Sequence, residues 1–174
     1  NQIQRGEADY YFSRYNHVWG WASWANRWAN YDVKMRDFKD FKKHNLIKNT
    51  WTDPKIQRYW IYLFEKVYNN EIDTWDYQWT YTCWKHSGYS ILPNKNLVKN
   101  IGFGEASTNT KDDDSAMANL ECFNISFPLV CSSELVLDEN ADQYTTKKMF
   151  SKRNILFRLI NKITRLLLKR SILK

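Results

Sequence analysis

The stretch Trp75-Asp76-Tyr77-Gln78-Trp79 places a carboxylate between two tryptophans. Indole faces stack on the apolar faces of pyranose rings, and a carboxylate beside them can accept the proton of a sugar hydroxyl. Asp76 is therefore a candidate general base. Spacing alone favours a simpler role for Asp76, that of a helix cap, because acidic residues commonly cap the first turn of a helix. A helix N-terminus also lowers the pKa of a carboxylate and weakens it as a base.

Three asparagines follow in a polar stretch closed by Gly102 and Gly104, and they are Asn94, Asn96 and Asn100. A side-chain amide offers both a donor and an acceptor to a sugar hydroxyl, so these residues are candidates for substrate binding. Asparagine is equally favoured in turns for its own hydrogen-bonding geometry. The sequence leaves both interpretations open.

The spacing predicts a helix that carries Asp76. Asp73 is a good N-cap, and Trp75, Trp79 and Cys83 recur at intervals of four residues and would share one face. Gly88 is expected just after the helix as the left-handed C′ residue. A short strand is expected to follow over Tyr89 to Leu92.

The chain resembles the C-terminal half of bacterial GT-A-fold glycosyltransferases, which are nucleotide-diphospho-sugar transferases often labelled hemolytic-protein-like. The resemblance covers roughly residues 8 to 142. Five motifs carry it in the same order: Tyr-Phe-Ser-Arg-Tyr at 11–15, Trp-Gly-Trp-Ala-Ser-Trp at 19–24, Trp-Asp-Tyr-Gln-Trp at 75–79, Pro-Asn-Lys-Asn-Leu-Val at 93–98 and Asn-Ile-Gly-Phe-Gly at 100–104.

This resemblance implies an α/β fold, with helices on a small mixed sheet that forms the acceptor-side portion of a Rossmann-like domain. It implies an inverting transfer of sugar from a nucleotide-sugar donor to a hydroxyl of a cell-surface glycan acceptor. Asp76 would be the base, held by Trp75 and Trp79. The Trp-Asp-x-x-Trp pattern is also similar to the eukaryotic N-acetylglucosaminyltransferase that initiates complex N-glycans, where the aspartate has that role.

The family's tryptophan-rich loop matches Tyr15, His17, Trp19 and Trp21, which the resemblance places at the border of the sugar cleft. Core packing is the alternative explanation for such aromatic residues, and it is preferred for Trp24 and Trp28. His17 alone is weak evidence of a ligand.

The donor side of such an enzyme is expected upstream of Asn1, so this segment alone is not expected to turn over substrate. A divalent cation, Mn or Mg, is implied for the full-length enzyme, with ligands mostly outside this segment. The Asp112 to Asp114 run does not qualify, because it lies in a polar stretch, residues 105–115, predicted to be a mobile loop. Asn109 stands where the family usually has a histidine, so the family's role for that residue is not transferred to this chain.

Charge separates the chain into two regions. Residues 151–174 hold eight of the 26 basic residues and no acidic one, which leaves 18 basic against 19 acidic residues before them. A near-neutral body argues against a nucleic-acid partner. The predicted domains are residues 1–146, the acceptor-side part, and residues 147–174, a basic amphipathic helix. Such a helix suits an anionic membrane surface, although packing on the domain explains it equally well.

Composition sets further limits. All nine tryptophans lie between residues 19 and 84, which predicts an aromatic-lined cleft in the first half. Three cysteines without CxxC spacing indicate neither a disulfide framework nor a zinc site, so a reducing, cytoplasmic location is expected, at most peripheral on the inner face of the membrane. A non-catalytic carbohydrate-binding module is the main alternative function, and a membrane-associating adaptor is a third.

Other elements are predicted from periodicity. We expect a strand or aromatic loop at residues 10–15, helices from Ala22, over residues 33–41 and from Pro54 after Asp53, strands at residues 119–128 and 135–137, and a turn at residues 138–144. The helix from Pro54 would carry an apolar stripe of Ile56, Tyr59, Trp60, Leu63, Phe64 and Val67.

Overall fold

The computed structural model describes residues 3–99 and 120–150 of the chain. The chain divides into two compact units, residues 1–138 and residues 139–174. Asn100, the predicted loop at 105–115, Asn109, the Asp112 to Asp114 run and the basic tail from residue 151 all lie outside the described residues. The fold is mixed α/β, as the sequence predicts.

A two-stranded antiparallel sheet joins the beginning of the first unit to its middle. Strand β1 spans Tyr10–Ser13 and strand β2 spans Ser90–Pro93, with Tyr10 opposite Pro93 and Ser13 opposite Ser90. An isolated parallel bridge adds Leu137 to the other edge of β1, where the Asp138 N–H donates to the Phe12 carbonyl at 2.9 Å. Residues 10–15 thus begin as a strand.

The strand predicted over residues 119–128 does not form in its described part, and the strand predicted at residues 135–137 is reduced to the single bridge at Leu137. Among the described residues, no strand lies beside this segment. Its contacts are single hydrogen bonds to loops, such as the Phe123 N–H to the Asn96 carbonyl at 2.9 Å. Phe127 is consequently 78% exposed.

The helices before residue 54 are short. Helix α1 spans Ala25–Trp28, α2 spans Phe38–Lys43, and a 3-10 turn, η1, spans Leu46–Asn49. The helix predicted over residues 33–41 was placed too early, because Met35 has a φ of 46° and cannot continue a right-handed helix. An Asp32 carboxylate oxygen accepts the Arg36 N–H at 2.9 Å and holds this turn.

Helix α3, Pro54–Tyr68, begins where the sequence predicts. The Asp53 carboxylate accepts the Lys55 N–H at 2.7 Å, and Pro54 needs no partner at the first helical position. The predicted apolar stripe is confirmed at its centre, where Trp60, Leu63, Phe64 and Val67 are buried. An amphipathic stripe of this kind fixes which face of the helix meets the core.

Helix α4 spans Asp76–Lys85, so the prediction that Asp73 caps it is wrong; Trp75 is the N-cap residue. Its C-terminus also differs from the prediction. Ser87, with a φ of 53°, is the left-handed C′ residue, and Gly88 follows it. The Gly88 N–H donates to the Cys83 carbonyl at 2.7 Å and the Ser87 N–H to the Trp84 carbonyl at 3.1 Å, which is a Schellman motif.

The second unit contains helix α5, Glu139–Met149. A turn was predicted for residues 138–144, and that prediction is wrong: the many polar residues there concealed a helix with acidic residues in its first turn and lysines in its last. The predicted domain boundary at residues 146/147 falls inside α5. None of the described helices has the length and hydropathy needed to span a membrane.

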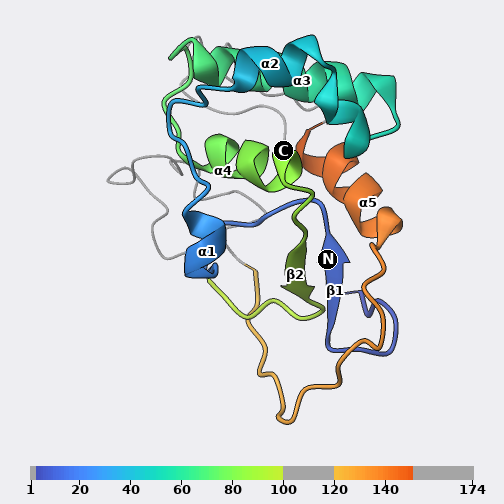
Figure 1. Ribbon diagram of the computed structural model, residues 1–174. Coiled ribbons are helices and arrows are strands. Elements are labelled where there is room, and N and C mark those ends of the chain that lie inside the picture. The colour runs from blue at the N-terminus through green and yellow to red at the C-terminus, as the bar shows by residue number, and fades with distance from the viewer. Residues whose placement is uncertain (1–2, 100–119, 151–174) are drawn as a thin grey trace, which may run out of the picture. The chain divides into compact units, whose positions relative to one another are not determined.

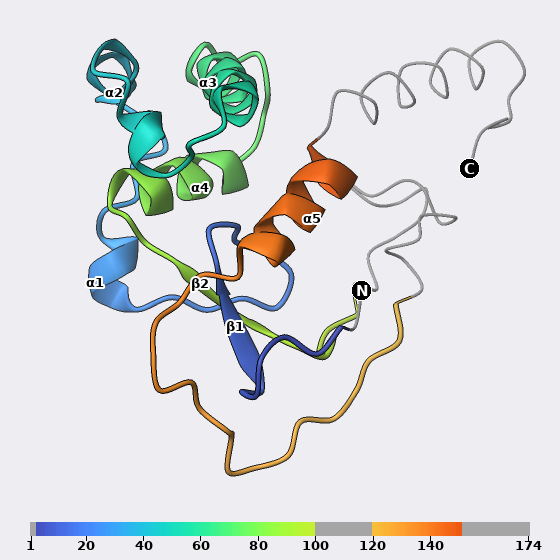
Figure 2. The ribbon, with the colours of Figure 1, turned by 90° about the vertical axis from the view of Figure 1, so that its right-hand side faces the viewer.

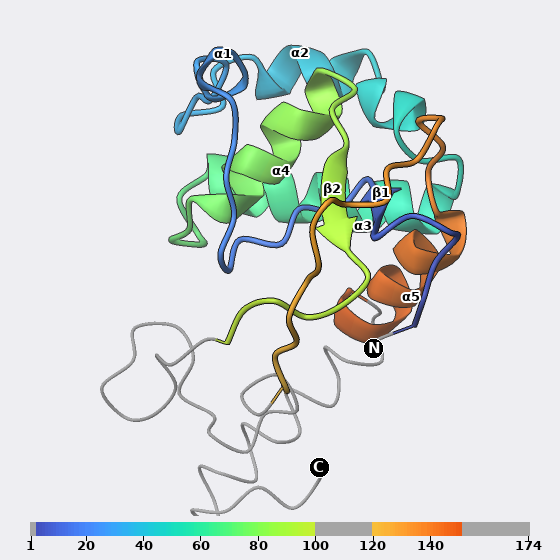
Figure 3. The same cartoon turned by 90° about the horizontal axis from the view of Figure 1, so that it is seen from below.

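In the first unit, α2 and α3 lie side by side above α4, and the β1–β2 pair lies below α4 (Figures 1 and 2). Figure 3 shows the two strands from below, with α4 to the left of β2. Aromatic rings fill the core between these tiers. The Trp60 and Trp84 rings meet edge to face at 4.7 Å, and Phe64 and Tyr81 do so at 5.5 Å.

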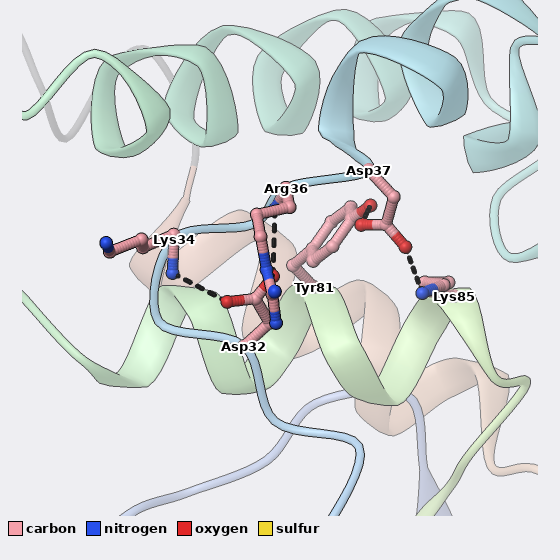
Figure 4. Close-up of polar contacts among 6 residues, drawn as sticks. All are labelled: Asp32, Lys34, Arg36, Asp37, Tyr81 and Lys85. Atoms are coloured by element: carbon pink, nitrogen blue, oxygen red, sulfur yellow. Dashed lines mark hydrogen bonds and ion pairs between the residues drawn. The ribbon is translucent and has the colours of Figure 1, made fainter.

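The carboxylate of Asp37, the residue just before α2, accepts hydrogen bonds from two side chains of α4 (Figure 4). The Tyr81 hydroxyl donates to one Asp37 oxygen at 2.7 Å, and the Lys85 ammonium donates to the other. Partial burial alone would raise the pKa of Asp37, but the hydrogen bonds from Lys85 and Tyr81 hold that pKa below its usual range. Burial and the Asp37 charge raise the pKa of Tyr81, so its hydroxyl stays a donor.

Replacing Asp37 with asparagine should lower the free energy of unfolding by about 1 kcal/mol at neutral pH, because a charge-assisted hydrogen bond is lost at a half-exposed site. The folded-state pKa of Asp37 is lowered. Its contribution is therefore complete above the ordinary aspartate pKa of about 4 and disappears as pH falls through the folded-state value. Urea denaturation from neutral to acid pH measures the difference in unfolding free energy between the wild-type and Asp37→Asn proteins. A difference that does not shrink below about pH 4 contradicts the prediction. The exposed Asp40→Asn is the control.

Candidate functional site

Five aromatic residues gather around the beginning of α4, and we call them the indole cluster: Trp21, Trp28, Tyr31, Trp75 and Trp79. The Trp21 ring stacks on that of Trp75 at 5.5 Å with an interplanar angle of 27°. The Trp28 and Tyr31 rings stack at 4.5 Å and 8°. Trp79 lies between these two pairs, 5.1 Å from Trp28 and 5.7 Å from Trp21.

One member of the indole cluster is buried, and two others are partly exposed to solvent. Trp79 is 6% exposed, whereas Trp28 and Trp75 are 40% and 42% exposed. Core packing was preferred for Trp24 and Trp28, and that preference is wrong. Trp24 is the more exposed of the two, at 69%, and Trp28 is held by Tyr31 at the surface. Partly exposed, rigidly stacked rings present flat apolar faces to a ligand.

Asp76 is the first residue of α4 and sits between two members of the indole cluster in the chain. Its side chain is half-buried, and the Thr74 hydroxyl donates a hydrogen bond to its Oδ1 atom. The helix cap therefore does not use this carboxylate in the predicted way. The Thr74 hydrogen bond holds one carboxylate oxygen and so orients the Asp76 side chain at the N-terminus of α4.

Tyr31 ties the indole cluster to the segment that precedes Asp76. Its hydroxyl donates to the Trp75 carbonyl at 3.1 Å. Burial raises the pKa of Tyr31, and the neighbouring negative charges of Asp76 and Asp32 raise it further. The phenol therefore remains a neutral hydrogen-bond donor beside the carboxylate. Sequence reasoning missed Tyr31 and Thr74; the only signal was their spacing, Tyr31 three residues after Trp28 and Thr74 two before Asp76.

The tryptophan-rich loop turns at Gly20, which has a φ of 63°. A Cβ atom at this position would meet the Val98 side chain, so the loop is packed tightly against the stretch that follows β2. Trp19 is half-buried and His17 is exposed. Of the loop residues predicted for the cleft, Trp21 is the one that joins the indole cluster.

Tyr15, predicted at the border of the cleft, lies in the core. It is 2% exposed, and its ring meets those of Trp51, Trp60 and Trp84 at 5.2 to 6.0 Å. Seven of the nine tryptophans thus fall into two groups. One group fills the core around Trp60, and the other forms the indole cluster.

Asn94 and Asn96 make hydrogen bonds within the protein. Asn94 is buried; its amide nitrogen donates to the Ala8 carbonyl at 2.8 Å and its oxygen accepts the Arg5 N–H at 3.1 Å. The Asn96 amide donates to the Glu121 carbonyl at 3.0 Å. These contacts favour the structural interpretation, in which the amides hold neighbouring segments together.

The three cysteines are free, and burial raises the pKa of Cys83 to about 12, so this thiol is protonated and a poor nucleophile. Residues 3–99 and 120–150 contain no group of three or more His, Cys, Asp or Glu side chains arranged to hold a metal ion. The divalent cation that the resemblance implies, with ligands mostly outside this segment, stays a prediction. Asp76 and the indole cluster are the candidate site within the described residues.

Comparison of this chain with protein-family models, with curated proteins and with solved structures finds no match.

Replacing Asn94 with alanine should lower the free energy of unfolding by about 2 kcal/mol, because the Arg5 N–H and the Ala8 carbonyl would lose their buried partner. Asn96→Ala, at an exposed hydrogen bond, is the matched control and should cost under about 1 kcal/mol. Chemical denaturation measures both. Equal stability of the Asn94→Ala and wild-type proteins would contradict the structural role.

Proposed function

We propose that this chain is the acceptor-side portion of a GT-A-fold glycosyltransferase. In this proposal Asp76 takes the proton from an acceptor hydroxyl while that oxygen attacks the anomeric carbon of a nucleotide-sugar. The single observation that supports it best is the position of the Asp76 carboxylate. It is half-buried, held on one oxygen by Thr74, and adjacent in the chain to Trp75, which stacks on Trp21 and is 42% exposed.

Three features of this geometry suit the proposed reaction. The exposed ring of Trp75 offers a stacking surface for an acceptor pyranose. The Thr74 hydrogen bond leaves the second carboxylate oxygen for the substrate hydroxyl. Tyr31 keeps the backbone before Asp76 in place through the Trp75 carbonyl. A positioned base of this kind contributes roughly 10²- to 10⁴-fold to the rate.

The remaining parts of the proposal follow from the family resemblance. The donor nucleotide and its divalent cation, Mn or Mg, would be held by residues outside this segment, and the acceptor would be a glycan or glycolipid of the cell surface. The enzyme would act on the cytoplasmic side of the membrane. The chain's own contribution is to bind and orient the acceptor and to remove its proton.

A non-catalytic carbohydrate-binding module is the second candidate. It is favoured by the exposed faces of Trp28 and Trp75, which could bind a sugar without any use of the carboxylate. Sugar transfer, and not glycan affinity, separates the two functions. Trp75→Ala should weaken glycan binding in both, and Asp76→Asn should leave affinity nearly unchanged in both. Only an enzyme has a transfer activity that Asp76→Asn would remove.

In the full-length protein, Asp76→Asn should lower sugar transfer by about 100-fold or more, because the amide cannot accept a proton. Incorporation of label from a panel of radiolabelled nucleotide-sugars into glycan measures this. Asp73→Asn is the matched control, since Asp73 is an exposed carboxylate just before α4, and it should retain activity. Activity of Asp76→Asn within a few-fold of wild type would exclude Asp76 as the base.

We also propose that residues 151–174 attach the protein to anionic membranes, since this segment has eight basic residues and a sustained apolar stripe. Removing these residues should abolish co-sedimentation with phosphatidylglycerol vesicles and should not change the weak binding to neutral phosphatidylcholine vesicles. Equal sedimentation of the two proteins with anionic vesicles would remove this proposal.

A further inference from the structure

Two neighbouring hollows lie on the surface formed by α2, η1 and α3, apart from the indole cluster. The first, of about 460 Å³, is lined by residues of α2 and of the end of α3. The second, of about 420 Å³, is lined by residues of the η1 region and of the middle of α3. Lys42 and Glu65 line both hollows, so their ion pair of 2.5 Å marks the boundary between them. We call the two together the lysine groove; its two helices lie side by side in Figure 2.

Positive charge dominates the lysine groove. Lys39, Lys42 and Lys43 all line the first hollow, because positions i, i+3 and i+4 share one face of α2. Arg58 lines the second hollow. Glu65 neutralises Lys42 alone, and Lys39, Lys43 and Arg58 have no ion-pair partner among the described residues. Three unneutralised cations on one surface favour an anionic ligand.

Each hollow also contains a tyrosine ring and a side-chain amide. Tyr68 and Asn69 line the first hollow, and Tyr62 and Asn45 line the second. The Lys39 ammonium lies 6.0 Å from the centre of the Tyr68 ring, and Tyr62 is 54% exposed. Aromatic rings accept the apolar faces of sugars, and amides bind hydroxyls. The same set of groups therefore occurs twice, on either side of the Lys42–Glu65 ion pair.

We propose that the lysine groove binds an acidic oligosaccharide, a glycan with carboxylate groups on neighbouring sugar units. The paired hollows supply a cation, a ring and an amide for each of two units. A lipid headgroup or inorganic phosphate would use the cations and leave the rings and amides without a role. Nucleic acid is disfavoured, because residues 1–150 carry 18 basic against 19 acidic residues. This binding does not depend on Asp76.

Lysine acetylation footprinting of the complete chain tests the site directly. A hexamer of galacturonic acid is the probe, and a neutral hexamer of glucose is the control ligand. The uronate should slow acetylation of Lys39 and Lys43 severalfold and leave the exposed Lys34 and Lys48, outside the groove, unchanged. The neutral hexamer should protect none of these lysines. Mass spectrometry resolves each lysine, so binding to the basic tail does not interfere.

Calorimetry of two variants with equal net charge provides the second measurement. Lys39→Gln with Lys43→Gln should weaken uronate binding about tenfold, and Lys34→Gln with Lys48→Gln by less than about twofold. Equal weakening in the two variants would show attraction by net charge and overturn the proposal. So would protection of Lys39 and Lys43 by inorganic phosphate or phosphatidylglycerol vesicles but not by uronate. Asp76→Asn should bind uronate like wild type, which separates this site from the proposed catalytic one.

Discussion

The burial of α4 on most of its circumference constrains the rest of the first unit. Six of its ten residues are buried, and three of those carry polar side chains: Gln78, Thr80 and Thr82. Buried polar groups are costly unless they are hydrogen-bonded. The Gln78 amide nitrogen donates to the Thr74 carbonyl at 2.6 Å, but the Gln78 Oε1 atom is buried without a hydrogen-bond partner among the described residues. The Thr80 and Thr82 hydroxyls donate to carbonyls four residues earlier, at 3.1 and 2.9 Å. The Trp84 ring nitrogen donates to the Arg14 carbonyl at 2.6 Å, which joins α4 to the chain just after β1.

This central position explains which elements could be predicted from the sequence. Helix α3 has one buried face, so its stripe and its Asp53-Pro54 start were predicted correctly. Helix α4 was predicted with the wrong ends, because a helix buried on several sides has no single apolar stripe to mark its limits, and Trp75 is an unusual N-cap residue. The strand predicted at residues 119–128 does not form in its described part, because pairing depends on a neighbour that local pattern does not specify.

The candidate site was predictable in part for a similar reason. Residue type identified Asp76 and its flanking tryptophans as capable of sugar chemistry, and the structure places Trp75 and Trp79 in one cluster. Residue type could not indicate that the Asn94 amide is used by Arg5 and Ala8, or that Tyr15 is surrounded by core rings. Long-range contacts decide whether a polar or aromatic side chain is available to a ligand. Such contacts also place Tyr31 in the indole cluster, and its spacing from Trp28 in the sequence was almost no indication of this.

The turn at Gly20 has a consequence for how this protein can vary. The left-handed backbone there disfavours any side chain, and the Val98 side chain occupies the space that a Cβ atom would need. Shortening Val98 would relieve the collision but would leave the backbone penalty, so one compensating change would not remove the whole cost of a side chain at position 20. The tryptophan-rich loop and the stretch after β2 should therefore diversify together, as a single interlocked unit, in any lineage that keeps this packing.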